Sequence, residues 1–147
     1  MYLLDTNHCS LAIIGNPNIL TRLSESSDIP IATTAIVRGE LINMAAQSQQ
    51  KQSNLTLIQN FLNGILLHPI DAVTADIYGQ LKADLFDKFA PKDKNKRRQF
   101  TLQNIGFGEN DLWIASTALQ YQLTLVTADR DFLRIQEACD LTLDNWT

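Results

Sequence analysis

Residues Met1–Asn7 spell MYLLDTN, and this stretch decides the fold that we predict for the whole chain. Tyr2, Leu3 and Leu4 form a continuous apolar run, which is typical of a strand covered on both faces in a parallel sheet. The run stops at Asp5, and the carboxyl edge of such a sheet is where open α/β folds bind ligands. An Asp after a strand is also a common helix cap, so this motif alone leaves both interpretations open.

The composition indicates one domain with one hydrophobic core. The chain has 147 residues, of which 45% are hydrophobic and 19% charged, and its net charge is −4. No apolar run reaches the roughly 18 to 20 residues that a membrane span needs, and no leader precedes the first strand. We therefore expect a single cytoplasmic domain over residues 1–147 without membrane contact. Cys9 and Cys139 lack zinc-site spacing, and we expect both to be reduced.

Apolar periodicity predicts short strands that alternate with helices. Strands are expected at residues 1–4, 29–32, 66–70, 123–126 and 141–143. Helices are expected at residues 9–14, 18–23, 34–50, 55–66, 73–90 and 110–121, with a short one from Phe132. Strands joined through helices predict an α/β fold in which the sheet is mainly parallel.

Glu40 is the first acidic residue that the helical pattern places on an apolar, core-facing side of a helix. On the predicted helix 34–50 it shares a face with the apolar residues Ile36, Val37, Leu41 and Met44. Burying a lone carboxylate costs several kcal/mol, about the scale of half a domain's stability. Glu40 must therefore be neutral, bound to a metal, or paired with a base such as Arg38.

Asp111 and Asp129 complete the set of candidate acids. Asp111 lies on the apolar face of the predicted helix 110–121, which Asn110 is expected to cap, although an acid there also suits the helix dipole. Trp113 falls off that face, and we expect it to pack against a neighbour. Asp129 follows the strand 123–126, as Asp5 follows the first strand.

These positions meet at one edge of a parallel sheet. Four carboxylates in one place repel, and some stay protonated near pH 7 unless a divalent cation neutralises them. Carboxylate oxygens suit Mg²⁺ or Mn²⁺, and such sites hydrolyse phosphodiesters. The sequence therefore predicts a metal-dependent phosphodiesterase site.

A basic segment precedes Asp111. Residues 87–98 carry six basic side chains against two acidic ones, and residues 91–108 show little periodicity, which predicts a long loop. We expect this basic insertion, at about residues 87–108, to lie near the mouth of the acidic cleft. Its charge suits either contact with phosphates or a solvated loop.

Four motifs in order along the chain carry a resemblance to a known family. LLDTN at 3–7, VRGEL at 37–41, NDLWIAST at 110–117 and VTADRDF at 126–132 resemble the four acidic motifs of PIN-domain nucleases, particularly the VapC-like toxin ribonucleases. The resemblance implies a three-layer α/β/α fold around a mainly parallel sheet. It also implies an RNA endonuclease that needs Mg²⁺ or Mn²⁺, forms a homodimer and is inhibited by a cognate antitoxin. Compact relatives have only a short link where this chain has residues 87–108.

Carried over by position, the resemblance gives each motif residue a role. The catalytic metal ligands are Asp5, Glu40, Asp111 and Asp129. Their supporting side chains are Thr6, Asn7, Thr127 and Asp131. Acids alone cannot hold RNA, so we expect nearby bases to contact its phosphates. These bases are Lys94, Lys96, Arg97, Arg98 and Arg130.

Three other interpretations deserve comparison. A phosphoacceptor receiver domain would need an Asp on its third strand and a Lys on its fifth, and neither is present. A haloacid-dehalogenase phosphatase would need a second acid where Asn7 stands. A catalytically inactive PIN scaffold that binds RNA or protein is the remaining alternative, and the retention of all four acids argues against it.

Overall fold

Five short strands form one all-parallel sheet in the order β3-β2-β1-β4-β5. The computed structural model describes residues 1–147. The strands are β1 (Tyr2–Leu4), β2 (Ile31–Thr34), β3 (Leu66–His68), β4 (Thr124–Val126) and β5 (Thr142–Asp144). The helices are α1 (Thr6–Ile13), α2 (Pro17–Glu25), α3 (Ala35–Gln47), α4 (Lys51–Leu62), α5 (Ala72–Phe89), α6 (Lys94–Gln99), α7 (Leu102–Ile105), α8 (Glu109–Gln120) and α9 (Arg130–Gln136).

The central strand is the apolar run at the start of the chain. Leu3 and Leu4 are fully buried, because β1 is paired on both sides and its two faces are covered by helices. Leu4 lies opposite Val126 of β4 in the ladder. The prediction of a central parallel strand ending at Asp5 is therefore confirmed.

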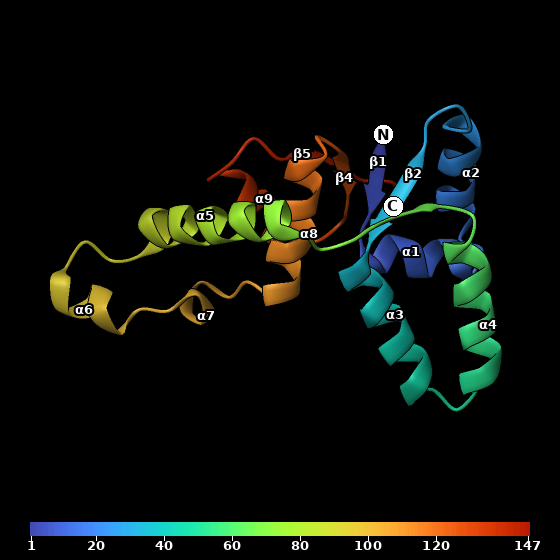
Figure 1. Ribbon diagram of the computed structural model, residues 1–147, viewed down its shortest axis with the longest axis horizontal. Helices are drawn as coiled ribbons and strands as arrows, with labels where there is room; N and C mark the ends of the chain where they lie inside the picture. The colour runs from blue at the N-terminus through green and yellow to red at the C-terminus, as the bar shows by residue number, and fades with distance from the viewer.

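The connections place helices on both faces of the sheet. From β1 the chain moves outward to β2 and β3 through α1–α4, and it then crosses back to β4 and β5 through α5–α9. Crossovers between parallel strands are right-handed, so opposite directions of travel put the two groups of helices on opposite faces. Figure 1 shows the sheet between these groups, a three-layer α/β/α arrangement. The direction reverses between β1 and β4, which is where such folds open a crevice.

Side-chain caps fix where the helices at that edge begin. Asp5 caps α1, Thr34 caps α3 and Asp129 caps α9, and each side chain accepts a backbone N–H of the first turn. Such caps satisfy donors that the helix leaves unpaired. Helix α8 differs from our prediction, because Gly108 occupies its cap position and the side chain of Asn110 is free for another contact.

The segment predicted as a long loop contains two short helices, α6 and α7. We call residues 86–108 the arm; it comprises the end of α5 together with α6 and α7. Ile105 and Phe107 of the arm are buried, and Arg97 lies over the ring of Phe86. Sequence periodicity missed the helices because aromatic and cationic contacts, rather than a regular apolar stripe, hold this segment.

The position of α6 corrects a second expectation. Figure 1 shows α6 at the far left end of the molecule, beyond α5, whereas α8 stands near the centre beside the sheet. No residue of α6 lines the acidic cleft described below. The prediction that the basic segment lies beside the cleft is therefore wrong for α6 within one copy of the chain.

Several smaller predictions can also be compared with the structure. The helix expected to reach residue 50 ends at Gln47, and Pro69 ends β3 after three residues. Trp113 stacks on Tyr78 with ring centroids 3.8 Å apart, so its partial burial is confirmed. Cys9 and Cys139 are both free, as expected. None of the helices combines the length and apolar character that crossing a bilayer requires.

Candidate active site

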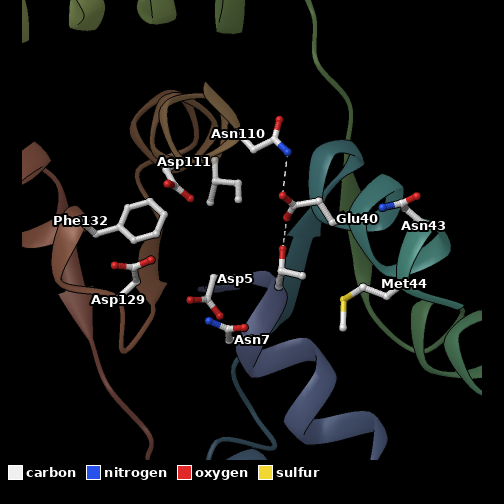
Figure 2. A pocket seen from close by; sticks show the side chains of 11 residues that line it. Asp5, Asn7, Glu40, Asn43, Met44, Asn110, Asp111, Asp129 and Phe132 are labelled. Atoms are coloured by element: carbon white, nitrogen blue, oxygen red, sulfur yellow. Dashed lines mark hydrogen bonds between the residues drawn. The ribbon is translucent and has the colours of Figure 1, made fainter. Parts of the chain in front are cut away.

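A cleft of about 390 Å³ opens at the carboxyl edge of the sheet, between α3 and α8. Its lining includes all four predicted acids, Asp5, Glu40, Asp111 and Asp129. Figure 2 shows the carboxylates of Asp5, Asp111 and Asp129 around one opening, with Glu40 across from them. Asp5 and Asp129 cap α1 and α9, whereas Glu40 and Asp111 lie on α3 and α8, so the fold brings together positions up to 124 residues apart in sequence.

Asp5 is the most deeply placed of the four, with 4% of its surface exposed. Its Oδ1 accepts the backbone N–H of His8 at 2.7 Å and lies 3.0 Å from the Nδ1 atom of that residue. Its own N–H donates to the carbonyl of Val126 at 3.2 Å. These contacts fix the carboxylate at the junction of β1 and β4.

Glu40 is held by neutral donors. Thr6 Oγ1 donates to Glu40 Oε2, and Asn110 Nδ2 donates to Oε1 at 2.7 Å. Both contacts are drawn as dashed lines in Figure 2. Arg38 is exposed and makes no ion pair with Glu40, so the alternative of a structural pair is wrong for that arginine.

Asp111 has the most perturbed ionisation in the cleft. Its pKa is raised to about 6, first by burial and then by the negative charge of Asp129, while a backbone hydrogen bond from Gly108 opposes the rise. Glu40 and Asp131 add smaller repulsions. Gly108 also makes room for this side chain, since a Cβ there would lie 2.7 Å from Asp111 Oδ2. Burial is thus the main cause of the raised pKa of Asp111, and the like charges of the neighbouring acids add to it.

Asp129 is positioned by its own turn. Its N–H donates to Thr127 Oγ1 at 3.0 Å, and its Oδ1 accepts the N–H of Asp131 at 2.9 Å. Carboxylate oxygens of Asp111, Asp129 and Asp131 lie within 4.8 Å of one another. Asp131 also faces Arg134 Nη1 at 3.4 Å, which makes it the one acid of this group with a cationic partner.

The donor set fits a hard divalent cation. Every charged side chain in the lining of the cleft is a carboxylate, and no Lys or Arg lies within 4.0 Å of the four acids. Mg²⁺ and Mn²⁺ prefer such oxygen ligands together with water, whereas zinc prefers nitrogen and sulfur. The carboxylate oxygens of Asp111, Asp129 and Asp131 lie close enough together to share one such cation, and Asp5 and Glu40 line the same cleft.

The other predicted residues divide into two groups. Thr6 and Asn7 line the cleft. Thr127 Oγ1 accepts the N–H of Asp129, and the N–H of Asp131 donates to Asp129 Oδ1. The predicted RNA-binding bases lie outside the lining. They are Arg130, which is exposed and next to Asp129 in sequence, and Lys94, Lys96, Arg97 and Arg98 of α6. Arg97 is engaged by Asp87.

Sequence reasoning did not assign several residues that line the cleft or contact its acids. Asn110 was expected to cap a helix and instead binds Glu40. His8 carried no metal-site spacing, yet it contacts Asp5. Phe132 forms part of the cleft wall. The available signal for His8 was its position three residues after a capping Asp, where a side chain in the first turn can reach back to the cap.

Comparison with known families agrees with the fold and the motifs. Residues 2–138 match the PIN domain, and the chain therefore belongs to the PIN domain family. It is similar to Ribonuclease VapC2 of Rickettsia felis, with 32% identity over 99% of this chain and 98% of that protein. It is also similar to the tRNA(fMet)-specific endonuclease VapC of Shigella flexneri, with 27% identity over 91% of each chain.

A solved structure gives the same fold over nearly the full length. The crystal structure of VapBC2 from Rickettsia felis bound to a DNA fragment from their promoter superposes with a TM-score of 0.80. The identity is 29%, and the match covers 99% of this chain and 98% of that one. The α/β/α fold and the resemblance to PIN-domain nucleases of the VapC type are thus confirmed.

Proposed function

We propose that this chain is a divalent-metal-dependent endoribonuclease and the toxin of a toxin–antitoxin pair. The observation that carries the proposal is the meeting of four carboxylates, from four separate elements, in one cleft without a Lys or Arg partner. Such a cluster costs stability unless a cation neutralises it. The ribonuclease names of its relatives support RNA as the substrate.

The cleft residues suggest how the reaction proceeds. When bound, Mg²⁺ or Mn²⁺ supplies Lewis-acid stabilisation of the phosphate charge and acidifies water. Asp5 and Glu40, fixed by their hydrogen bonds, hold their oxygens in place. A carboxylate oxygen of Asp111, which lines the cleft among the other acids, accepts a proton from the attacking water. The new bond joins that water oxygen to phosphorus, and the bond to the 3′-oxygen breaks. The leaving 3′-oxygen takes up a proton from bulk water, so the products are a 5′-phosphate and a 3′-hydroxyl.

RNA must also be held against the negative field of the acids. Exposed Arg130, beside Asp129, is the base nearest in sequence to the cleft, and we assign it a phosphate contact. The bases of α6 would contact RNA that extends to the arm, or RNA bound to a second copy in a homodimer.

The antitoxin would bind at an apolar groove that adjoins the cleft. This groove, of about 300 Å³ between α1, α3 and α4, shares Met44 with the acidic cleft. Ile14, Met44 and Leu57 on or beside its walls are 76%, 52% and 49% exposed. Exposed apolar residues along a helix-lined groove suit the apolar face of a partner helix. An Ile14→Glu chain should escape neutralisation by its antitoxin when the two are coexpressed, with cleavage of RNA unchanged in the isolated toxin.

A cleavage assay tests the central proposal. Purified protein is incubated with total cytoplasmic RNA, and separately with a purified tRNA pool, in Mg²⁺, Mn²⁺ or EDTA. We expect cleavage with either metal, none in EDTA, and 5′-phosphate ends on the products. Undiminished cleavage in EDTA would contradict the metal role. Binding of RNA without cleavage in any metal would favour the inactive PIN scaffold.

A further inference from the structure

His8 is a fully buried imidazole one helical turn behind the acidic cleft. No part of its surface is exposed. Its Nδ1 lies 3.0 Å from Asp5 Oδ1, and its backbone N–H donates to the same oxygen at 2.7 Å. Its Nε2 is buried and has no hydrogen-bond partner. The neighbouring residues Thr6 and Asn7 line the cleft, whereas His8 does not.

The environment determines which ring nitrogen carries the proton. With the proton on Nδ1, the ring donates to Asp5 Oδ1, and Nε2 keeps only a bare lone pair. With the proton on Nε2, the lone pair of Nδ1 would face a carboxylate oxygen and an N–H would be buried without an acceptor. The first tautomer is therefore favoured over the second, and His8 donates to Asp5 Oδ1 through Nδ1.

Packing alone does not account for an imidazole at this position. An apolar side chain would fill the same buried space without leaving Nε2 unpartnered, and an unpartnered buried polar atom costs stability. The compensating contact is the hydrogen bond to Asp5. That bond occupies Oδ1, while Oδ2 makes no hydrogen bond within the protein and Asp5 lines the cleft.

We propose that His8 is a positioning residue, which holds the Asp5 carboxylate so that Oδ2 faces a divalent cation. The inference rests on the proposed function, because it assigns Asp5 as a metal ligand. A donor behind a ligating carboxylate fixes its orientation, and losing such a donor typically weakens metal affinity by about 10-fold to 100-fold. His8 thereby sets how strongly the cleft binds its cation.

Matched substitutions separate the hydrogen bond from the packing. His8→Asn keeps an N–H donor near the position of Nδ1, since the two side chains are alike up to that atom. His8→Leu keeps apolar volume and removes the donor, and His8→Gln places its donor near the position of Nε2 instead. The dissociation constant for Mn²⁺ is measured by calorimetry on each full-length protein, and thermal melting checks that each is folded.

We expect His8→Leu and His8→Gln to weaken Mn²⁺ binding by about 10-fold to 100-fold, and His8→Asn to stay within about 3-fold of the wild type. The Mn²⁺ concentration for half-maximal RNA cleavage should shift in parallel, while kcat at saturating Mn²⁺ changes less. If His8→Leu does not fold, the comparison of Asn with Gln gives the same discrimination.

Two results would overturn the inference. Equal Mn²⁺ affinity in the wild type, His8→Leu and His8→Gln would show that the bond does not orient Asp5. Equal weakening in all three variants, including His8→Asn, would show that only the shape of the imidazole matters. If the wild type binds no Mn²⁺, both the proposed function and this inference are contradicted. If the wild type binds Mn²⁺ and His8→Leu binds it equally well, only this inference is contradicted.

Discussion

The arm and the acidic cleft differ in the groups that surround their charged side chains. In the arm, Arg97 pairs with Asp87 and lies over Phe86, so a cation meets both an acid and a ring. In the cleft, Glu40 meets two neutral donors, and Asp111 lies among other acids. Opposite charges in contact contribute to the fold, whereas gathered like charges are tolerated only at a cost. The difference agrees with an arm that is held by packing contacts and with the proposal that the cleft binds a cation.

The largest effect should come from removing one carboxylate of the cleft. Asp5→Asn keeps the shape and the helix cap, because Asn caps as well as Asp, but it removes one charged ligand. RNA cleavage should fall by at least about 100-fold, beyond the loss expected for a residue that only supports a ligand. The measurement is the initial rate of RNA cleavage in Mg²⁺. Asp28→Asn, at an exposed position outside the cleft, is the matched control. Equal cleavage rates for the two variants would show that Asp5 matters no more to cleavage than a surface acid does.

The arm should respond to a lost cation through its stability. Arg134 donates to the carbonyl of Ile105 at 2.7 Å and lies over the rings of Phe107 and Phe89, at 4.6 and 5.5 Å. Arg134→Met should lower the free energy of unfolding by about 1 to 2 kcal/mol, because it loses the hydrogen bond and the ring contacts. Denaturant melts measure this change. Arg98→Met, at an exposed position without such contacts, should change it little, and equal effects would refute the role of these contacts.

The cleft should respond to lost charge in the opposite direction. Because the pKa of Asp111 is raised in the folded state from 3.8 to about 6, its ionisation opposes folding. This cost is absent below about pH 4, grows as the pH rises toward 6, and is complete above that value. In metal-free buffer at pH 7.5, Asp111→Asn should raise the melting temperature by roughly 2 to 4 °C, a figure discounted for solvent screening.

Two conditions should remove that gain. At pH 3.5 the wild type carries a protonated Asp111, so the two melting temperatures should converge. Added Mg²⁺ should also narrow the gap, because it binds the folded wild type more tightly than the variant. A lower melting temperature for Asp111→Asn at pH 7.5 would instead favour a structural role for Asp111 at the start of α8.

The smallest effect should come from the bases of α6. Lys94, Lys96 and Arg98 are exposed. When the logarithm of the RNA-binding constant is plotted against the logarithm of the salt concentration, replacing all three with Ala should reduce the steepness of the slope by about 2. Arg97 is left in place because Asp87 already engages it. Cleavage of bound RNA should change little, since none of these bases lines the cleft. If the salt slope is unchanged and antitoxin binding is weaker, α6 contacts the antitoxin and not RNA. If neither changes, α6 is a solvated surface helix that binds neither. Lys51→Ala on α4 serves as a surface-lysine control.

The order of the strands and helices could be predicted, because each element is encoded by a local pattern of apolar residues. Apolar runs that stop at Asp5 and before Asp129 marked the two strands beside the crevice, and the face of Glu40 marked its helix. The arm could not be predicted, because its two short helices depend on contacts such as Arg134 with Phe107, which come from distant parts of the chain.

The acids of the cleft were predictable for the same reason, and their partners were not. Asp5, Glu40, Asp111 and Asp129 sit at strand ends or on apolar faces, which sequence patterns reveal. The bond from Asn110 to Glu40 joins α8 to α3 across the cleft, and no periodicity within either helix encodes it. The roles of these residues in metal binding and catalysis stay predictions until they are measured.

Direct measurement of metal binding tests the central claim that the cleft acids hold a divalent cation. Mn²⁺ is titrated by calorimetry into wild type, Asp5→Asn and Asp28→Asn at pH 7.5, and into wild type at pH 5. We predict that wild type and Asp28→Asn bind alike at pH 7.5, that Asp5→Asn binds at least about 10-fold more weakly, and that wild-type affinity falls at pH 5 as Asp111 takes up a proton. Equal binding by all three proteins, or no binding by the wild type, would contradict the account.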